Sequence, residues 1–140
     1  MKYVLDASVA VKWVLPEDDS ALAEAVRDRI LAGDIDAVAP DTFPVEIAHA
    51  LTRAERRGTI PTGQAPFGMR LILLDGPSMH PYVPLLPRAV ELSSEKRIGV
   101  YDCLYVALAE EQDCELITAD AKLVNAFQEM SRIVLLSDLS

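Results

Sequence analysis

The sequence is poor in the residues that build disulfide frameworks, zinc sites and hydrolytic triads, with two cysteines and two histidines in 140 residues. Cys103 and Cys114 form neither a CxxC pair nor part of a cysteine–histidine metal spacing, so we interpret both as reduced structural residues. His49 and His80 lie outside any motif. A GxSxG nucleophile elbow is absent, as are the phosphate-binding patterns GxxxxGKS/T and GxGxxG. These absences argue against triad, zinc and nucleotide-binding chemistry.

Long hydrophobic runs are missing as well. No apolar stretch approaches the roughly 18 residues that a transmembrane helix needs. The first residues, MKYVLDASVAVKWV, combine a lysine with an apolar stretch, as signal peptides do. Asp6 and Lys12 interrupt that stretch, and no A-x-A-like cleavage site follows it. We therefore predict a cytoplasmic protein with no membrane partner.

Positive charge is scarce, with 13 Lys and Arg against 22 Asp and Glu and a formal net charge of −9. A protein that holds nucleic acid by general electrostatic attraction normally presents a basic face. A nuclease is not excluded, because carboxylates clustered around divalent cations form a site that phosphate oxygens can join. The charge thus favours local, metal-bridged contact helped by a few arginines.

The chain is rich in core-forming residues. Hydrophobic residues make up 51% of it, and its length fits one domain over residues 1–140. Residues 2–5, 36–39, 115–118 and 132–136 are predicted strands, with a short extended piece near 80–83. Helical patterns cover residues 7–14, 17–31, 41–57, 69–74, 87–96, 102–112 and 121–130. This alternation predicts an α/β fold of three layers, with a short, mostly parallel central sheet flanked by helices.

Three acidic residues stand where parallel sheets gather their ligands, beyond the carboxyl ends of the strands. Asp6 directly follows the first strand, and Asp120 follows the strand 115–118 after one intervening residue. Asp102 heads a helix in which seven successive apolar residues follow it, which indicates a buried helix. Each aspartate also has a simpler explanation, because Asp is a favoured helix N-cap.

A fourth acid, Glu46, belongs to the predicted helix 41–57. Helical spacing aligns it with His49, Arg53 and Arg57 in one polar stripe. The stripe is either a solvated face with an intrahelical ion pair or a functional face. In the functional case, Glu46 joins the other acids and Arg53 or Arg57 approaches a phosphate.

Carboxylates brought within a few ångströms of one another repel, and a divalent cation removes that conflict. Mg²⁺ and Mn²⁺ favour oxygen ligands, completed by water and substrate phosphates. Asp6, Glu46, Asp102 and Asp120 could together hold one or two such ions. Metal ions of this kind activate water and stabilise a departing oxyanion. The set therefore favours metal-dependent phosphodiester hydrolysis.

Four segments carry a family resemblance that covers nearly the whole chain: LDASVAVKWVLPE, VEIAHAL, YDCLYVALAEE and LITADAKL. In the order and spacing of their acids they resemble a PIN domain and, more narrowly, the VapC-type toxins of toxin–antitoxin pairs. The resemblance assigns the four family acids to Asp6, Glu46, Asp102 and Asp120. It also implies that the hydroxyls of Ser8 and Thr118 support the metal site.

The resemblance implies an Mg²⁺- or Mn²⁺-dependent endoribonuclease, a homodimer, held inactive by a VapB-type antitoxin. One departure from the family concerns the last helix, where some PIN domains carry a further acid and this chain has Leu123, Val124 and Asn125. The number of metal ions therefore stays open between one and two.

Two other classes of function compete with a nuclease. A receiver-like signalling domain is also α/β with an acidic Mg²⁺ pocket, but it calls for an adjacent acidic pair after the first strand and a lysine after a late strand. Asp6 stands alone, and Lys122 lies at a predicted helix start. The other alternative is a PIN fold that binds RNA or a protein without cutting.

Overall fold

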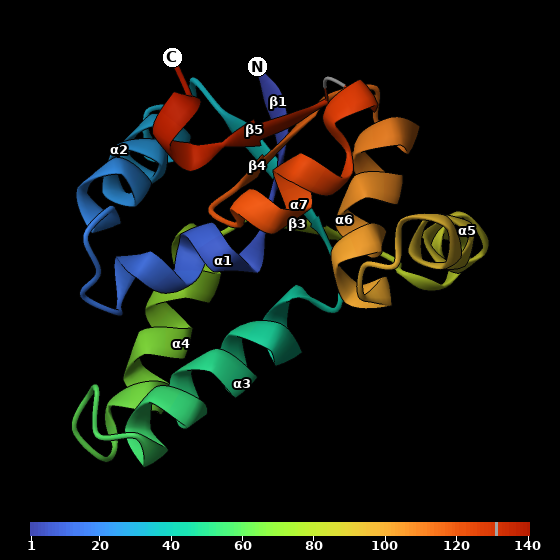
Figure 1. Cartoon of the computed structure of the whole chain (residues 1–140). Helices are drawn as coiled ribbons and strands as arrows, with labels where there is room; N and C mark the ends of the chain where they lie inside the picture. The colour runs from blue at the N-terminus through green and yellow to red at the C-terminus, as the bar shows by residue number, and fades with distance from the viewer. Residues whose placement is uncertain (131) are drawn as a thin grey trace.

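The computed structural model describes residues 1–130 and 132–140, which fold around a parallel sheet of five strands (Figure 1). The strand order is β3-β2-β1-β4-β5, and every pair of neighbours is parallel. The strands are β1 (Lys2–Leu5), β2 (Asp36–Pro40), β3 (Ser78–His80), β4 (Glu115–Thr118) and β5 (Ile133–Leu135).

Helices connect successive strands. The described α-helices are α1 (Ala7–Ala10), α2 (Ser20–Leu31), α3 (Phe43–Arg56), α4 (Gln64–Asp75), α5 (Leu86–Lys96), α6 (Val100–Glu111) and α7 (Ala121–Ala126). Short 3₁₀ turns are η1 (Val11–Trp13), η2 (Val83–Leu85), η3 (Gln128–Met130) and η4 (Leu136–Asp138).

The sheet reverses its direction of growth at β1. From β1 the chain adds β2 and then β3 on one side, and it returns to add β4 and β5 on the other. Right-handed crossovers then place α1–α4 and α5–α7 on opposite faces, which gives three layers. The junction of β1 and β4 is a topological switch point, where ligands of open α/β sheets bind.

Helix α6 has the longest run of buried residues among the described elements, and it lies against β1, β2 and β4. Residues 103–109 are all buried, which explains why the sequence there is apolar on every side. The helix begins at Val100, after Gly99, so Asp102 lies in its first turn. That turn lies at the carboxyl end of the sheet, so the carboxylate of Asp102 is located there, at the start of a largely buried helix.

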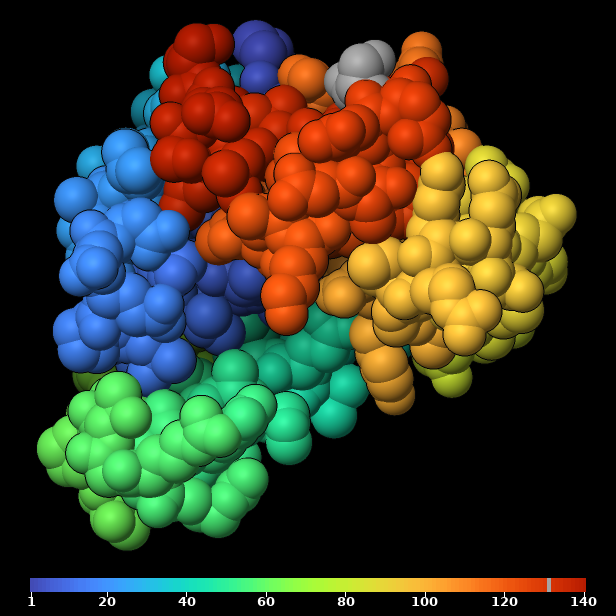
Figure 2. Space-filling view, in the orientation of Figure 1, coloured from blue at the N-terminus to red at the C-terminus, as the bar shows by residue number. Residues whose placement is uncertain are grey.

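Helices α3 and α4 pack against each other and extend beyond the sheet (Figure 1). In the space-filling view a crevice separates α3 from the segments above it (Figure 2). Hollows lined by Glu46, His49 and Arg53 follow α3 along this side. None of the helices in residues 1–130 and 132–140 has both the length and the apolar character needed to cross a membrane.

The α/β prediction is confirmed, and the sheet is wholly parallel. The predicted helix 7–14 was wrong in its second half, which tightens into η1, where Trp13 Nε1 donates a hydrogen bond to the Ala23 carbonyl (2.9 Å). The helix predicted from residue 17 begins at Ser20. Glu17 and Asp19, just before it, both form ion pairs with Lys12. The edge strand lies at 78–80, slightly before the predicted 80–83, and the last helix breaks at Phe127 into α7 and η3.

Candidate active site at the carboxyl end of the sheet

Asp6 lies at the junction of β1 and β4. Its backbone N–H donates to the Ile117 carbonyl (3.0 Å), which continues the pairing of the two strands by one residue. The residue is 5% exposed. Asp6 is the N-cap of α1, but its side chain makes no capping hydrogen bond. Capping therefore does not account for its carboxylate.

Two hydroxyls hold the Asp6 carboxylate. Ser8 Oγ donates to Asp6 Oδ2 (2.8 Å), and Thr118 Oγ1 donates to the same oxygen (2.7 Å). Ser8 Oγ also accepts from the Ala119 N–H (3.0 Å), so it joins the ends of β1 and β4. The structure thus brings together Asp6 and the two hydroxyl residues that the sequence singled out.

Burial raises the pKa of the Asp6 carboxyl above its ordinary value. The hydrogen bonds from Thr118 and Ser8 lower that pKa in part, and the charge of Asp120 raises it further. A buried carboxylate with a second acid nearby is costly to ionise without a compensating positive charge.

Asp102 lies in the first turn of α6 and not at its N-cap, which is Gly99. The capping interpretation is therefore wrong for this residue. Burial raises the pKa of Asp102 to about 6, and the charges of Asp6 and Asp120 add to the shift. These interactions place Asp102 within electrostatic reach of both strand-end aspartates.

Glu46 lies in the first turn of α3 and is half-buried. Tyr105 Oη donates to Glu46 Oε2 (2.7 Å), whereas Glu46 Oε1 is buried and has no hydrogen-bond partner in the described residues. Burial raises the pKa of Glu46 to about 7. The bond from Tyr105 opposes that shift, and the charges of Asp6 and Asp102 reinforce it. The solvated-face interpretation is therefore wrong for Glu46.

Tyr105 is the site residue that sequence reasoning missed, because it stands within the apolar run of α6. Its spacing from Asp102, three residues along one helix, was the available signal, since such residues share a face. A buried tyrosine hydroxyl also usually has a hydrogen-bond partner. The predicted set therefore did not contain the residue that fixes Glu46.

Among the N-cap aspartates of the described helices, Asp120 is the one that caps its helix through its side chain. Its Oδ1 accepts from the Lys122 N–H (2.9 Å) at the start of α7, and its own N–H donates to Thr118 Oγ1 (3.1 Å). Capping occupies one carboxylate oxygen and leaves the other available. The side chain therefore has a structural role and can still take part in a charged site.

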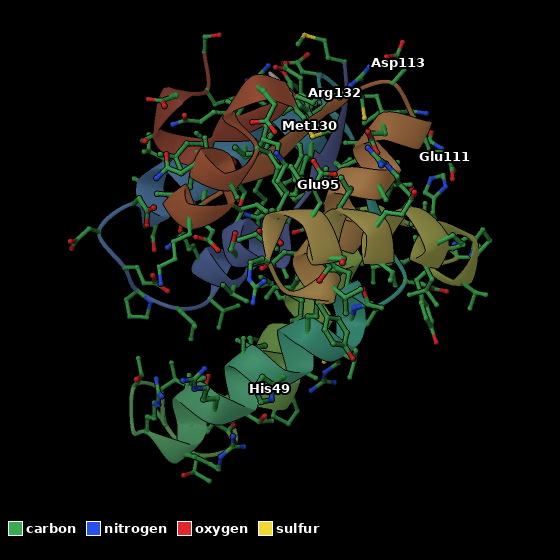
Figure 3. All side chains as sticks on the ribbon, turned by 45° about the vertical axis from the view of Figure 1, so that its right-hand side comes forward. His49, Glu95, Glu111, Asp113, Met130 and Arg132 are labelled. Atoms are coloured by element: carbon green, nitrogen blue, oxygen red, sulfur yellow. The ribbon has the colours of Figure 1, made fainter. Side chains whose placement is uncertain are left out.

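Among the residues that the structure describes, an acidic side chain at the amino end of the sheet forms an ion pair, whereas the four acids at the carboxyl end do not. At the amino end, Asp113 lies beside Arg132, with 2.9 Å between Asp113 Oδ1 and Arg132 Nη2 (Figure 3). At the carboxyl end, no ion pair within the described part of the chain involves the four acids Asp6, Glu46, Asp102 and Asp120. Protons, or a cation from outside the described residues, would neutralise these acids.

The donor set fits a hard divalent cation. It consists of carboxylate oxygens, and one of them, Glu46 Oε1, is buried without a partner. Among the described residues, no three acidic, histidine or cysteine side chains lie close enough to form a ready cage for a metal ion. Mg²⁺ does not need such a cage, because it usually takes one or two carboxylates and keeps several waters.

Arg53 lies further along α3 and Arg57 is the residue directly after its end. Both line a hollow of about 410 Å³ together with His49, which Figure 3 labels on α3. Both arginines are exposed, and neither forms an ion pair with another described residue.

Cys103 and Cys114 are free cysteines, in agreement with the expectation of reduced thiols.

Comparisons with known proteins agree with this architecture. Residues 3–128 match the PIN domain family. Ribonuclease VapC3 of Pyrobaculum aerophilum is 30% identical over 129 residues, covering 91% of this chain and 95% of that protein. Ribonuclease VapC1 of Mycobacterium tuberculosis is 36% identical over 92 residues, covering 63% of this chain and 65% of that protein.

The crystal structure of PAE2754 from Pyrobaculum aerophilum has the same fold, with a TM-score of 0.72 at 18% identity. The match covers 98% of this chain and 93% of that one. The match of residues 3–128 to the PIN domain family and the similarity to VapC3 confirm the family resemblance noted in the sequence, and the receiver-like alternative is set aside. The chain therefore belongs to the PIN domain family and, within it, to the VapC type.

Proposed function

We propose that this protein is an endoribonuclease dependent on Mg²⁺ or Mn²⁺ and acts as the toxin of a VapBC-type toxin–antitoxin pair. The proposed ligands of the metal are Asp6, Glu46, Asp102 and Asp120. Relatives named VapC ribonucleases support RNA as the substrate class. An enzyme that cuts cellular RNA would act in the cytoplasm.

One observation carries the proposal: acids from four separate elements share one electrostatic environment at the carboxyl end of the sheet. Each of Asp6, Glu46 and Asp102 has a raised pKa, and in every case another acid of the set contributes to the rise. A fold selected for stability alone would gain by pairing or removing such charges. Clusters of perturbed titratable groups are typical of functional sites.

The chain's own residues position this set. Thr118 and Ser8 fix one oxygen of Asp6, and Tyr105 fixes one oxygen of Glu46, so that the second oxygen of each carboxylate stays available. When bound, a divalent cation would lower the pKa of a coordinated water and neutralise charge on the scissile phosphate. Preorganised ligands of this kind need little rearrangement when substrate binds.

The net charge of −9 argues against a broad RNA-binding surface, so substrate contact would be local. We assign Arg53 and Arg57 to RNA phosphates on the side of α3 that carries the crevice. The VapC type also implies a VapB-type antitoxin as a partner and a homodimer as the assembly. The antitoxin and the homodimer are proposed from the similarity to VapC proteins alone, because the structure contains a single chain.

Metal binding and RNA cleavage together test the proposal. Wild-type protein should bind Mn²⁺ in calorimetry, cut RNA in Mg²⁺ or Mn²⁺, and lose cutting in EDTA. Asp6→Asn and Asp102→Asn should each remove detectable cleavage while the thermal unfolding transition is kept. The exposed Asp18→Asn serves as the matched control and should cut like wild type.

Two results would oppose the proposal in different ways. Cleavage at the wild-type rate by either aspartate variant would refute the four-acid site. Tight RNA binding without cleavage at any metal concentration would support the alternative, a PIN fold that binds without cutting.

A further inference from the structure

A second hollow opens beside the one that contains Glu46. Val45 and Tyr101 line both, so the two hollows are neighbours beside the first turns of α3 and α6. The second has a volume of about 310 Å³. That is the lower end of the range of small-ligand pockets, about 300–1,000 Å³. No step proposed above uses this hollow.

Two tyrosines stand at its rim. Tyr82 comes from the turn before η2 and is 38% exposed, and Tyr101 comes from α6 and is 58% exposed. Leu86, Val100 and Leu104 form the apolar floor. Aromatic side chains over an apolar floor are typical of sites that stack the unpaired bases of single-stranded RNA.

The hollow has two polar groups beside its tyrosines, the carboxylate of Asp41 and the hydroxyl of Thr42, whose Oγ1 is buried without a hydrogen-bond partner among the described residues. Asp41 is the charged one of the two. Its Oδ1 accepts from the Tyr82 N–H (3.0 Å), and the Asp41 N–H donates to the His80 carbonyl (2.8 Å). Asp41 Oδ2 has no hydrogen-bond or ion-pair partner among the described residues. The loop that carries Tyr82 is thus fixed, and one carboxylate oxygen stays free beside it.

This free oxygen sets the chemistry of the occupant. A carboxylate repels phosphate, so the hollow suits a base and not the RNA backbone. It accepts hydrogen bonds from amino groups, as acidic residues do from the cytosine amino group. Uracil has no amino group, and its single donor at that edge, the N3–H, lies between two carbonyl oxygens that the carboxylate would repel, so uracil is the base that this carboxylate favours least.

We propose that the hollow between Tyr82 and Tyr101 is a nucleobase subsite, which stacks a base next to the scissile phosphate and selects bases that carry an amino group. The inference rests on the proposed ribonuclease function and adds its specificity. Because this hollow shares Val45 and Tyr101 with the hollow of Glu46, a base bound here would lie next to the hollow that contains one of the proposed metal ligands.

Cleavage mapping tests the subsite. Wild-type protein is incubated with a random-sequence RNA pool and Mn²⁺, and the bases beside each cut are counted. We expect adenine, cytosine or guanine at one fixed position and depletion of uracil there. Tyr101→Ala should lower kcat/KM by roughly 5- to 150-fold, the range of one lost base–aromatic stack. Asp41→Asn, which keeps an oxygen for the Tyr82 N–H and adds an amide donor, should admit uracil.

Phe67→Ala and Asp18→Asn are the matched controls. Phe67 is an exposed aromatic residue on α4, 62% exposed, and Asp18 is an exposed acid. Both variants should keep the wild-type base preference. Wild-type preferences and rates in Tyr101→Ala and Asp41→Asn would overturn the subsite and leave the nuclease intact.

A binding measurement separates this inference from the nuclease itself. Fluorescently labelled oligo(A), oligo(C) and oligo(U) are titrated with Asp102→Asn protein. Weaker binding of oligo(U), and loss of that difference in Asp41→Asn, would support the subsite even if wild type cut no RNA. Equal binding of all three would overturn it. If Tyr101→Ala weakens only inhibition by a co-expressed antitoxin, the hollow receives a protein side chain and the inference is also overturned.

Discussion

The hydroxyl of Tyr105 donates a hydrogen bond to the carboxylate of Glu46, with 2.7 Å between Tyr105 Oη and Glu46 Oε2. The two residues are 59 positions apart in sequence and come from α6 and α3. The bond joins α6, which has the longest run of buried residues, to the helix that borders the crevice (Figure 2). It also holds the orientation of a carboxylate whose other oxygen has no partner.

Tyr105→Phe tests this positioning role. The variant should lower kcat/KM by about 10- to 100-fold, as loss of an outer partner of a metal ligand does. Unfolding free energy should fall by about 1–3 kcal/mol, because the variant leaves Glu46 Oε2 without its hydrogen-bond partner. Because the bond lowers the pKa of Glu46, its loss should move the acid limb of the pH–rate profile to higher pH.

Tyr3→Phe is the control for that experiment. Tyr3 is a buried tyrosine on β1, and its hydroxyl makes no hydrogen bond to a described residue. A lower rate with an unchanged pH profile would mean that Tyr105 contributes packing and does not tune Glu46.

The raised carboxyl pKa values predict an unusual dependence of stability on pH in the metal-free protein. The pKa is about 7 for Glu46 and about 6 for Asp102, against ordinary values near 4 in an unfolded chain. A group that binds its proton more tightly when folded stabilises the fold while protonated. That stabilisation is complete below about pH 4 and is lost as the pH rises toward 7.

Thermal unfolding in EDTA at about pH 5 and pH 8 measures this effect. The Tm should be lower at the higher pH, and Mn²⁺ should restore it there, because the cation replaces the protons. The double variant Glu46→Gln/Asp102→Asn should show a smaller difference between the two pH values, and Asp18→Asn should show the wild-type difference. A Tm that rises from the lower to the higher pH in EDTA, equally in both variants, would contradict the assignment.

Thr118 makes hydrogen bonds to both Asp6 and Asp120. A substitution that removes its hydroxyl but keeps its volume tests those hydrogen bonds separately from packing. Thr118→Val keeps the shape of a fully buried side chain but removes the bond to Asp6 and the acceptor of the Asp120 N–H. The unfolding free energy should fall by about 1–3 kcal/mol. Mn²⁺ affinity in calorimetry should fall by about 10- to 100-fold. Thr118→Ser, which retains the hydroxyl, should recover most of the affinity, and a valine variant that binds Mn²⁺ like wild type would contradict this role.

The sequence predicted those parts of the fold and site whose signals are local. β1 and β4 are short apolar runs that could be recognised from the sequence. β1 ends directly before Asp6, and β4 ends at Thr118, so both of these candidate site residues lie at the carboxyl end of the sheet. β3 was harder, because an edge strand of three residues has little apolar pattern, and Met79 is exposed. The tight turn at η1 depends on a contact from Trp13 to α2, which no local pattern encodes.

The candidate site follows the same division. Asp6, Asp102 and Asp120 could be predicted because they mark junctions between elements, but their separate roles could not. Whether an aspartate caps a helix depends on its side-chain direction, and only Asp120 makes the capping bond. The pairing of Glu46 with Tyr105 required tertiary structure, since it joins two helices across the crevice.

Arg53 and Arg57 provide the last test, because their alignment with Glu46 on α3 fits both an RNA contact and a solvated face. Each phosphate contact to single-stranded RNA should contribute about −0.7 to the slope of log affinity against log salt concentration. In Asp102→Asn protein, which keeps the RNA intact, Arg53→Gln and Arg57→Gln should therefore each make the slope shallower by about 0.7. Fluorescence anisotropy of a labelled RNA across a salt series measures it. Arg70→Gln, an exposed arginine on α4, should keep the wild-type slope. If all three variants have that same slope, the stripe on α3 is a solvated face, and RNA reaches the acids from another side.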